Sequence, residues 1–136
     1  MLLAVFYAIA GYLHIAAPEN FLRITPEWVP YAPLVVTLTG WAEIAGAIAL
    51  LQPFSLRLRQ AGGIGLAVYA LCVWPANINH MLMDMAAMAA GEAPSVAAGM
   101  AYHVPRMFAQ PMVIWLALWS ANAVDWPFRR RASGQD

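Results

Sequence analysis

The sequence is poor in charged residues and has a single cysteine. Asp, Glu, Lys and Arg make up 10% of its 136 residues, whereas a soluble globular domain has roughly 25%. Hydrophobic residues make up 62%, so the composition favours a membrane protein over a soluble one. Cys72 is the only thiol, which excludes an intramolecular disulfide and dithiol chemistry within this chain. We interpret Cys72 as a small buried hydrophobe.

Four apolar runs approach the roughly 17 to 25 residues that cross a bilayer as a helix. They cover about 1–17, 34–51, 61–80 and 104–124. We therefore predict an all-α fold, an integral membrane four-helix bundle in which 1–128 form a single transmembrane domain and 129–136 a basic tail. The first run is alternatively a signal peptide. However, no Lys or Arg precedes it, and its small residues lie too early for a usual cleavage site.

The charges between the runs predict the orientation in the membrane. Arginines occur between the second and third runs and in the tail, whereas the other two links are net acidic. Because positively charged loops stay in the cytoplasm, both termini are expected there. The chain is then a multi-pass protein of the bacterial cytoplasmic (inner) membrane, with the lipid bilayer as its surroundings. The tail serves as a topology anchor, and no nucleic-acid partner is expected. The arginines concerned are Arg57, Arg59, Arg129, Arg130 and Arg131.

Polar residues inside the apolar runs are the candidate ligand-binding residues. Such residues are costly in lipid and usually face the interior of the bundle. Within each run their spacing puts them on one helical face. Helical rise places Glu43 near the middle of its run and the others nearer the outer surface. We therefore predict a polar cavity that opens outward, with Glu43 at its bottom. The candidates are His14, Glu43, Asn77, His80, Arg106 and Gln110.

Structural roles for the same residues remain open. Pro75 and Pro111 leave the carbonyls of Leu71 and Met107 without their helical donors, and the amides of Asn77 and Gln110 are near enough in sequence to replace them. Glu43 alternatively forms an ion pair or hydrogen bond with Arg106 or His14 that only holds the helices together.

Metal binding and catalysis have little support in the sequence. The stretch HMLMDMAAM offers His80 and four methionines, ligand types that suit Cu(I). Its spacing matches no defined metal motif, so no metal site is predicted and copper is not favoured. There is also no phosphate-binding loop, nucleophile elbow or Cys/His zinc pattern. The sequence does not establish catalytic activity of the chain on its own.

Three segments resemble the DoxX-like family of small bacterial membrane proteins. They are YAPLVVTLTGWAEIAGAIALL (31–51), AGGIGLAVYALCVWPANINH (61–80) and RMFAQPMVIWLALW (106–119), which are similar to the TG-x-x-E, PAN and R-x-x-x-QP segments of that family. The early GYLH matches as well. The family's recurring polar positions fall on His14, Glu43, Asn77, Arg106 and Gln110.

The resemblance implies a four-helix protein associated with membrane redox assemblies. On this basis we expect an accessory protein that binds a quinone or another small lipophilic ligand and contacts a membrane or periplasmic redox partner. This chain lacks the paired cysteines of some redox relatives, which argues against a disulfide-linked role. Two alternatives remain, a structural or assembly protein and a small transporter or proton path. The second is weakened because no ionisable residue continues the polar path inward.

Overall fold

The computed structural model describes residues 2–126, and within them the chain is helical without any strand. The all-α prediction is therefore confirmed. The helices are α1 (Leu2–Ala16), α2 (Glu19–Leu22), α3 (Ala32–Leu51), α4 (Leu56–Ala89) and α5 (Met100–Ser120). The predicted basic tail, 129–136, lies outside the described residues, as do residues 1, 127 and 128 of the predicted transmembrane domain.

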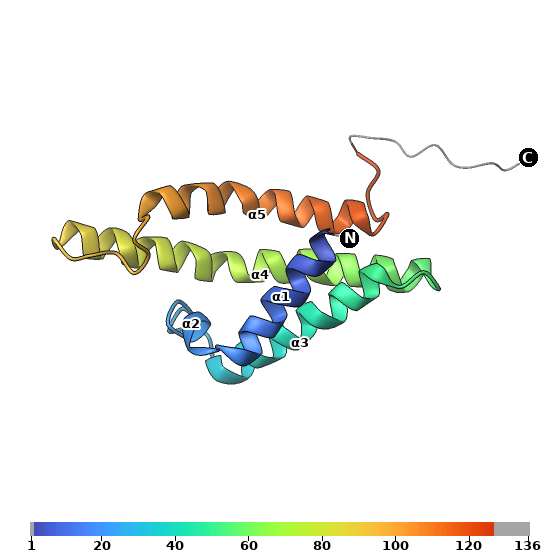
Figure 1. The fold of residues 1–136 in the computed structure, drawn as a ribbon, viewed down its shortest axis with the longest axis horizontal. Helices are drawn as coiled ribbons and strands as arrows, with labels where there is room; N and C mark the ends of the chain where they lie inside the picture. Colours follow the sequence, from blue (N-terminus) through green and yellow to red (C-terminus); the bar gives the residue numbers. More distant parts are fainter. Residues whose placement is uncertain (1, 127–136) are drawn as a thin grey trace, which may run out of the picture.

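The long helices pack as two pairs (Figure 1). α1 lies against α3, α5 lies against α4, and contacts between α3 and α4 join the pairs. The start of α1, the α3–α4 turn and the end of α5 lie at the same end of the molecule. The short α2 lies near the opposite end of α1, in the link to α3.

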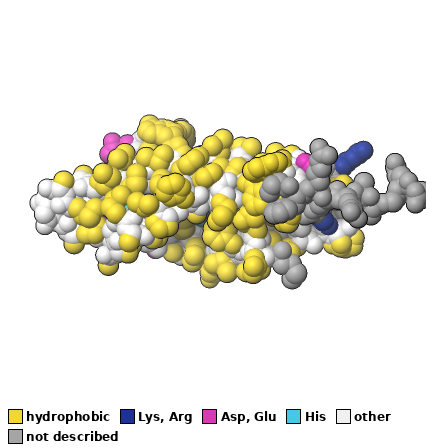
Figure 2. Space-filling view, turned by 90° about the horizontal axis from the view of Figure 1, so that it is seen from above, with side chains coloured by type: hydrophobic (Ala, Val, Ile, Leu, Met, Phe, Trp, Pro, Cys, Tyr) yellow, Lys and Arg dark blue, Asp and Glu magenta, His cyan; other side chains and the backbone are white. Residues whose placement is uncertain are grey.

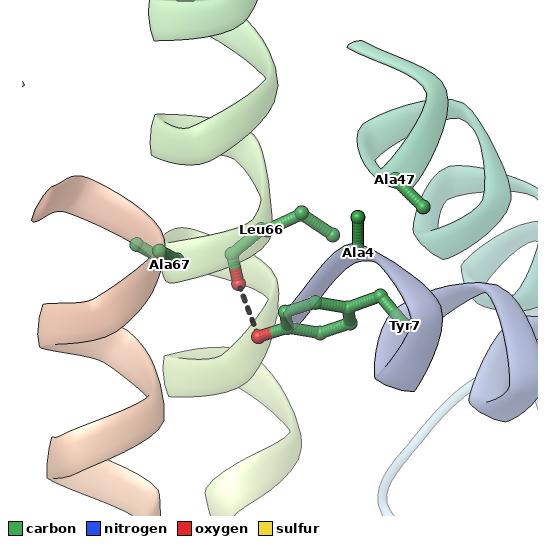
Figure 3. Close-up of a cluster of buried hydrophobic side chains, with 6 residues drawn as sticks. Ala4, Tyr7, Ala47, Leu66 and Ala67 are labelled. Carbon is green, nitrogen blue, oxygen red and sulfur yellow. Dashed lines mark hydrogen bonds between the residues drawn. The ribbon is translucent and has the colours of Figure 1, made fainter. Parts of the chain in front are cut away.

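A small apolar core lies where the pairs meet (Figure 3). Tyr7 of α1 and Leu66 of α4 are its largest side chains, and each is 2% exposed. The Tyr7 hydroxyl donates to the carbonyl of Leu66 over 3.5 Å. The rest of the core is alanine, from all four long helices. Small side chains allow the helix backbones to approach closely, as is common between helices in lipid.

Two glycines set the distance between α1 and α3. A Cβ atom at Gly11 would lie 2.5 Å from the carbonyl oxygen of Gly40, and one at Gly40 would lie 2.8 Å from that of Gly11. No real Cβ atom tolerates such contacts. The two backbones therefore touch at this point, just beside His14 and Glu43.

α4 is longer than the predicted span 61–80 at both ends. It begins after Ser55, whose Oγ accepts a hydrogen bond from the N–H of Leu58. It then continues through Pro75 and the polar residues up to His80 and ends only at Ala89. At about 1.5 Å per residue its 34 residues measure roughly 50 Å. A bilayer core is roughly 30 Å thick, so part of α4 must extend beyond any membrane it crosses.

The surface is strongly apolar (Figure 2). Hydrophobic side chains cover most of the face shown, and large ones such as Trp41 and Phe108 are more than half exposed. Two helices, Ala32–Leu51 and Leu56–Ala89, are long and apolar enough to cross a membrane. α1 is apolar but shorter. Cys72 is exposed rather than buried, so the interpretation of this residue as a buried hydrophobe is wrong.

Candidate functional site

A cavity of about 490 Å³ lies between the two helix pairs. Its walls come from the four long helices and from the link that contains α2. Most of the lining is apolar, but five of the six predicted ligand-binding residues contribute to it. These five are His14, Glu43, Asn77, Arg106 and Gln110. The sixth, His80, is not part of the lining.

Glu43 is the most deeply buried acid in the cavity wall, at 3% exposure. Its Oε2 lies 2.9 Å from Nδ1 of His14. That nitrogen is also 2.9 Å from the carbonyl oxygen of Ala10, and a carbonyl can only accept, so Nδ1 carries the proton and donates to Ala10. Oε2 of Glu43 is therefore in contact with the imidazole but has no aligned hydrogen bond.

Tyr69 completes this part of the wall. Its hydroxyl lies 3.4 Å from Nε2 of His14 and also interacts with the side chains of Glu43 and Thr39. The ring of Phe21 stacks on His14, with centroids 3.7 Å apart. The imidazole is thus held by its own helix, by Tyr69 and by the link. Of the two partners predicted for Glu43, the structure brings His14 to it and not Arg106.

Asn77 and Gln110 form a polar bridge between α4 and α5. Nδ2 of Asn77 donates to Oε1 of Gln110 over 3.1 Å, and Nε2 of Gln110 donates to the carbonyl of Ala70. The amides therefore do not bond to the carbonyls of Leu71 and Met107, as the kink-repair interpretation required. Gln110 instead reaches the carbonyl one residue before Leu71, from the neighbouring helix.

Arg106 lies in the second turn of α5, at the end of the cavity near α2. Its Nη1 lies 3.3 Å from Nδ1 of His80, and its guanidinium is 5.4 Å from the ring centre of Tyr102. No ion pair in the described part of the chain includes Arg106. The cavity wall thus contains a cation that has no anionic partner in residues 2–126.

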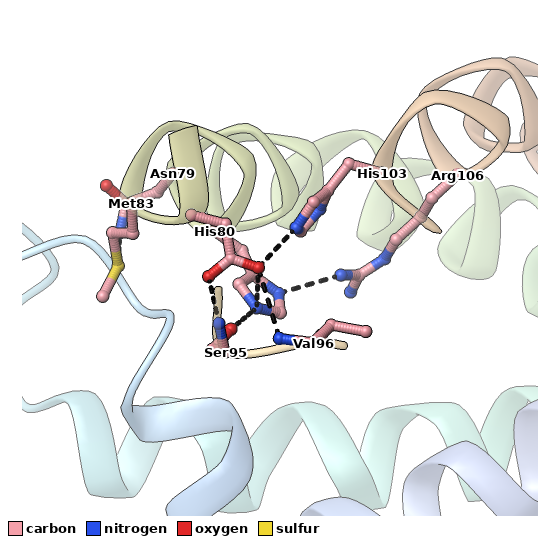
Figure 4. A network of polar contacts seen from close by, with 8 residues as sticks. Asn79, His80, Met83, Ser95, Val96, His103 and Arg106 are labelled. Atoms are coloured by element: carbon pink, nitrogen blue, oxygen red, sulfur yellow. Dashed lines mark hydrogen bonds and ion pairs between the residues drawn. The ribbon is translucent and has the colours of Figure 1, made fainter. Parts of the chain in front are cut away.

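His80 belongs to a second polar group, the histidine cluster, made of His80, Asp84, Ser95 and His103 (Figure 4). Nε2 of His103 donates to Oδ2 of Asp84 over 2.9 Å, and His103 is completely buried. The backbone N–H of Ser95 donates to Oδ1 of Asp84 over 2.8 Å, and Nε2 of His80 lies 2.8 Å from Oγ of Ser95. The cluster fastens the α4–α5 link to both helices.

The sequence reasoning missed this cluster because it ended the helix at His80. Asp84 then counted as a loop charge, although it is 2% exposed. One signal was available: Asp84 follows His80 by four residues, which puts both on one face if the helix continues. His103 precedes Arg106 by three residues and so shares its helical face, but spacing alone does not indicate a partner for it.

Two histidines and a carboxylate are also a ligand set for zinc, and their ligand atoms lie within 4.8 Å of one another. Arg106 argues against a cation there. Because a guanidinium only donates, Nδ1 of His80 must accept, and Nε2 carries the proton that a metal would have to displace. The fixed charge of Arg106 adds repulsion. The arrangement fits a hydrogen-bonded cluster better than a metal centre.

Asp84 lies one turn beyond the predicted span 61–80. The hydrogen bond from His103, followed by those from Ser95 and Val96, holds the pKa of its carboxyl well below the usual range. Each of these bonds favours the charged form. Asp84 therefore remains an acceptor for the link at neutral pH.

A family model described as a domain of unknown function, DUF8561, matches residues 3–122. The chain belongs to this family. No curated protein and no solved structure matches it. The matched residues extend from α1 to α5 and therefore include both the cavity residues and the histidine cluster. The family description assigns no activity. The resemblance to DoxX-like proteins stays a prediction.

Proposed function

We propose that this chain is a four-helix protein of the bacterial inner membrane, with both termini cytoplasmic, that binds a small lipophilic molecule in its cavity. Support for the membrane comes from the exposed apolar side chains and from the two membrane-length helices. Large contiguous apolar surfaces are rare on soluble monomers. The chain ends of α1 and α5 lie at one end of the molecule, as this topology requires.

The observation that carries ligand binding is the state of Glu43. Its Oε2 is buried in the wall of a mostly apolar cavity and lacks a hydrogen bond. Buried acceptors in proteins are nearly always satisfied, and an unsatisfied charged one is costly. A ligand with an O–H or N–H group would supply the missing donor. The cavity volume also falls within the roughly 300 to 1,000 Å³ that is usual for small-molecule sites.

The family resemblance suggests a role for this binding. If the DoxX-like relationship holds, the protein is an accessory to a membrane redox system with a membrane or periplasmic redox partner. One candidate ligand is then a quinone, whose reduced form carries the O–H groups that could donate to Glu43. Glu43 and His14 would then exchange hydrogen bonds or protons with the ligand. The chain itself is proposed to bind rather than to catalyse.

Native mass spectrometry of the protein in mild detergent tests the proposal. A small molecule should remain bound at one per chain, and extraction with organic solvent should identify it. A protein that stays folded and carries neither lipid, quinone nor partner in any preparation contradicts ligand binding.

A structural function is the second candidate, and the bridge from Asn77 to Gln110 and Ala70 favours it. In this case the polar residues only specify how the helices pack. Substitutions would then lower stability and any cellular function together, whereas a stable variant that has lost function would exclude it.

A further inference from the structure

Arg106 is the feature of the cavity that the proposed function leaves unexplained. Its guanidinium carries five N–H donors, yet its one hydrogen bond in the described residues goes to the neutral acceptor Nδ1 of His80. Arg106 is half-buried, and charges that are partly withdrawn from water are normally paired. A neutral imidazole satisfies one donor and does not neutralise the charge.

The surroundings of Arg106 add to this positive character. Arg23, from the link after α2, is near enough to act on His80 together with Arg106. The carboxylate of Asp84 is occupied by His103, Ser95 and Val96. None of the ion pairs in residues 2–126 joins an acid to Arg106.

The two ends of the cavity have opposite requirements. Arg106 needs an anion, and about one helical turn further along α5 the amide of Gln110 already bonds to Asn77 and Ala70. Beyond this bridge, Oε2 of Glu43 is an acceptor without an aligned donor. The wall between them is largely apolar, with Val36, Val73 and Val113 among its residues.

We infer that the cavity ligand is an amphiphile whose carboxylate or phosphate head binds Arg106, whose apolar part lies along the wall, and whose far end carries the O–H or N–H group that meets Oε2 of Glu43. Planar guanidinium groups bind carboxylate and phosphate through two parallel hydrogen bonds, which a neutral head cannot reproduce. This inference rests on the proposed function, because it names the chemical class of the ligand for the same cavity.

The test compares probes of equal chain length. Binding of dodecanoate, dodecyl phosphate and dodecanol to the purified full chain in nanodiscs is measured by calorimetry. The two anions should bind roughly 10- to 100-fold more tightly than the alcohol, as expected for a charged hydrogen-bonded pair. Arg106→Gln should remove this preference, and Arg106→Lys should keep part of it because the charge remains.

Arg57→Gln is the matched control, because Arg57 is an exposed arginine in the first turn of α4 and does not line the cavity. The Arg57→Gln variant should prefer the two anions over dodecanol to the same extent as the unmodified chain. Competition then identifies the source of the head group: displacement by phosphatidylglycerol indicates a bilayer lipid, and displacement by inorganic phosphate indicates a soluble anion. Both results support Arg106 as the anchor.

Two outcomes contradict the inference, and they have different consequences for the proposed function. If dodecanol binds the unmodified chain as tightly as dodecanoate, the anionic head is wrong while ligand binding survives. If none of the three probes binds, the inference fails as a whole, and native mass spectrometry of the purified chain decides separately whether the cavity binds any ligand. The comparison of probes on the unmodified chain remains decisive even if Arg106→Gln does not fold.

Discussion

His14 of α1 and Glu43 of α3 meet beside a close contact between their helix backbones, with Nδ1 of His14 2.9 Å from Oε2 of Glu43. Gly11 and Gly40 touch one turn earlier on the same two helices. The imidazole donates to Ala10 in its own helix, so Oε2 of Glu43 touches the imidazole without an aligned hydrogen bond. The packing of α1 on α3 therefore determines the geometry of the proposed ligand site.

Replacement of Glu43 by Gln should weaken binding of a ligand whose O–H or N–H reaches this position. The amide oxygen is a neutral acceptor, and hydrogen bonds to charged groups are stronger by about 1 kcal/mol, so roughly tenfold weaker binding is expected. Calorimetry with the ligand that co-purifies measures it. Thr37→Val is the control on the same helix, since Thr37 bonds to Pro33 and does not line the cavity. Equal affinity of the Glu43→Gln variant and the unmodified chain would exclude a contact between ligand and carboxylate.

The bridge between Asn77 and Gln110 should be a coupled unit. Asn77→Ala leaves Oε1 of Gln110 without its donor, which should cost about 1 to 3 kcal/mol of unfolding free energy. A double-mutant cycle with Gln110→Ala, followed by denaturant unfolding in mild detergent, should give a coupling of about 0.5 to 3 kcal/mol. Strictly additive effects would show that the bridge contributes nothing as a pair.

A methyl group at either close glycine should separate α1 from α3. Gly11→Ala and Gly40→Ala each place a Cβ against a backbone carbonyl, and overpacking of this kind costs about 1 to 3 kcal/mol. Gly65→Ala is the control, because a Cβ there meets nothing within 4 Å and alanine is the better helix former. Thermal unfolding should therefore show a lower midpoint for the first two variants and an unchanged or higher one for the third. The reverse order would mean that the helices do not pack in this way.

The contribution of Asp84 to stability should depend on pH at the acidic end. Its pKa is lowered in the folded protein, so its stabilising effect is complete above the unfolded value of about 4 and is lost as the pH falls towards the folded pKa. Asp84→Asn should therefore melt below the unmodified chain by a constant interval between about pH 5 and 7. The interval should narrow only below about pH 4. An interval that already closes near pH 6 would assign the effect to a histidine.

The sequence predicted the all-α fold, the four long helices with α4 too short, and most of the polar residues that line the cavity. Helical periodicity and the cost of polar groups in apolar runs led to His14, Glu43, Asn77, Arg106 and Gln110, and these five line one cavity. Their partners depend on tertiary packing and could not be read from spacing. Gln110 bonds to Ala70, forty residues away, and nothing local indicates this. His80 was grouped with the others because its helix was expected to end there, whereas α4 continues and gives it Asp84 and Ser95 as neighbours.

Blocking the cavity tests the central claim most directly. Val113→Trp adds a large side chain to the cavity wall, whereas Val104→Trp adds the same bulk at an exposed position of the same helix outside the lining. Native mass spectrometry of the three proteins should find one small molecule per chain in the unmodified protein and in Val104→Trp, and none in Val113→Trp. A folded Val113→Trp variant that retains the same molecule at the same stoichiometry would contradict the assignment of this cavity as the ligand site.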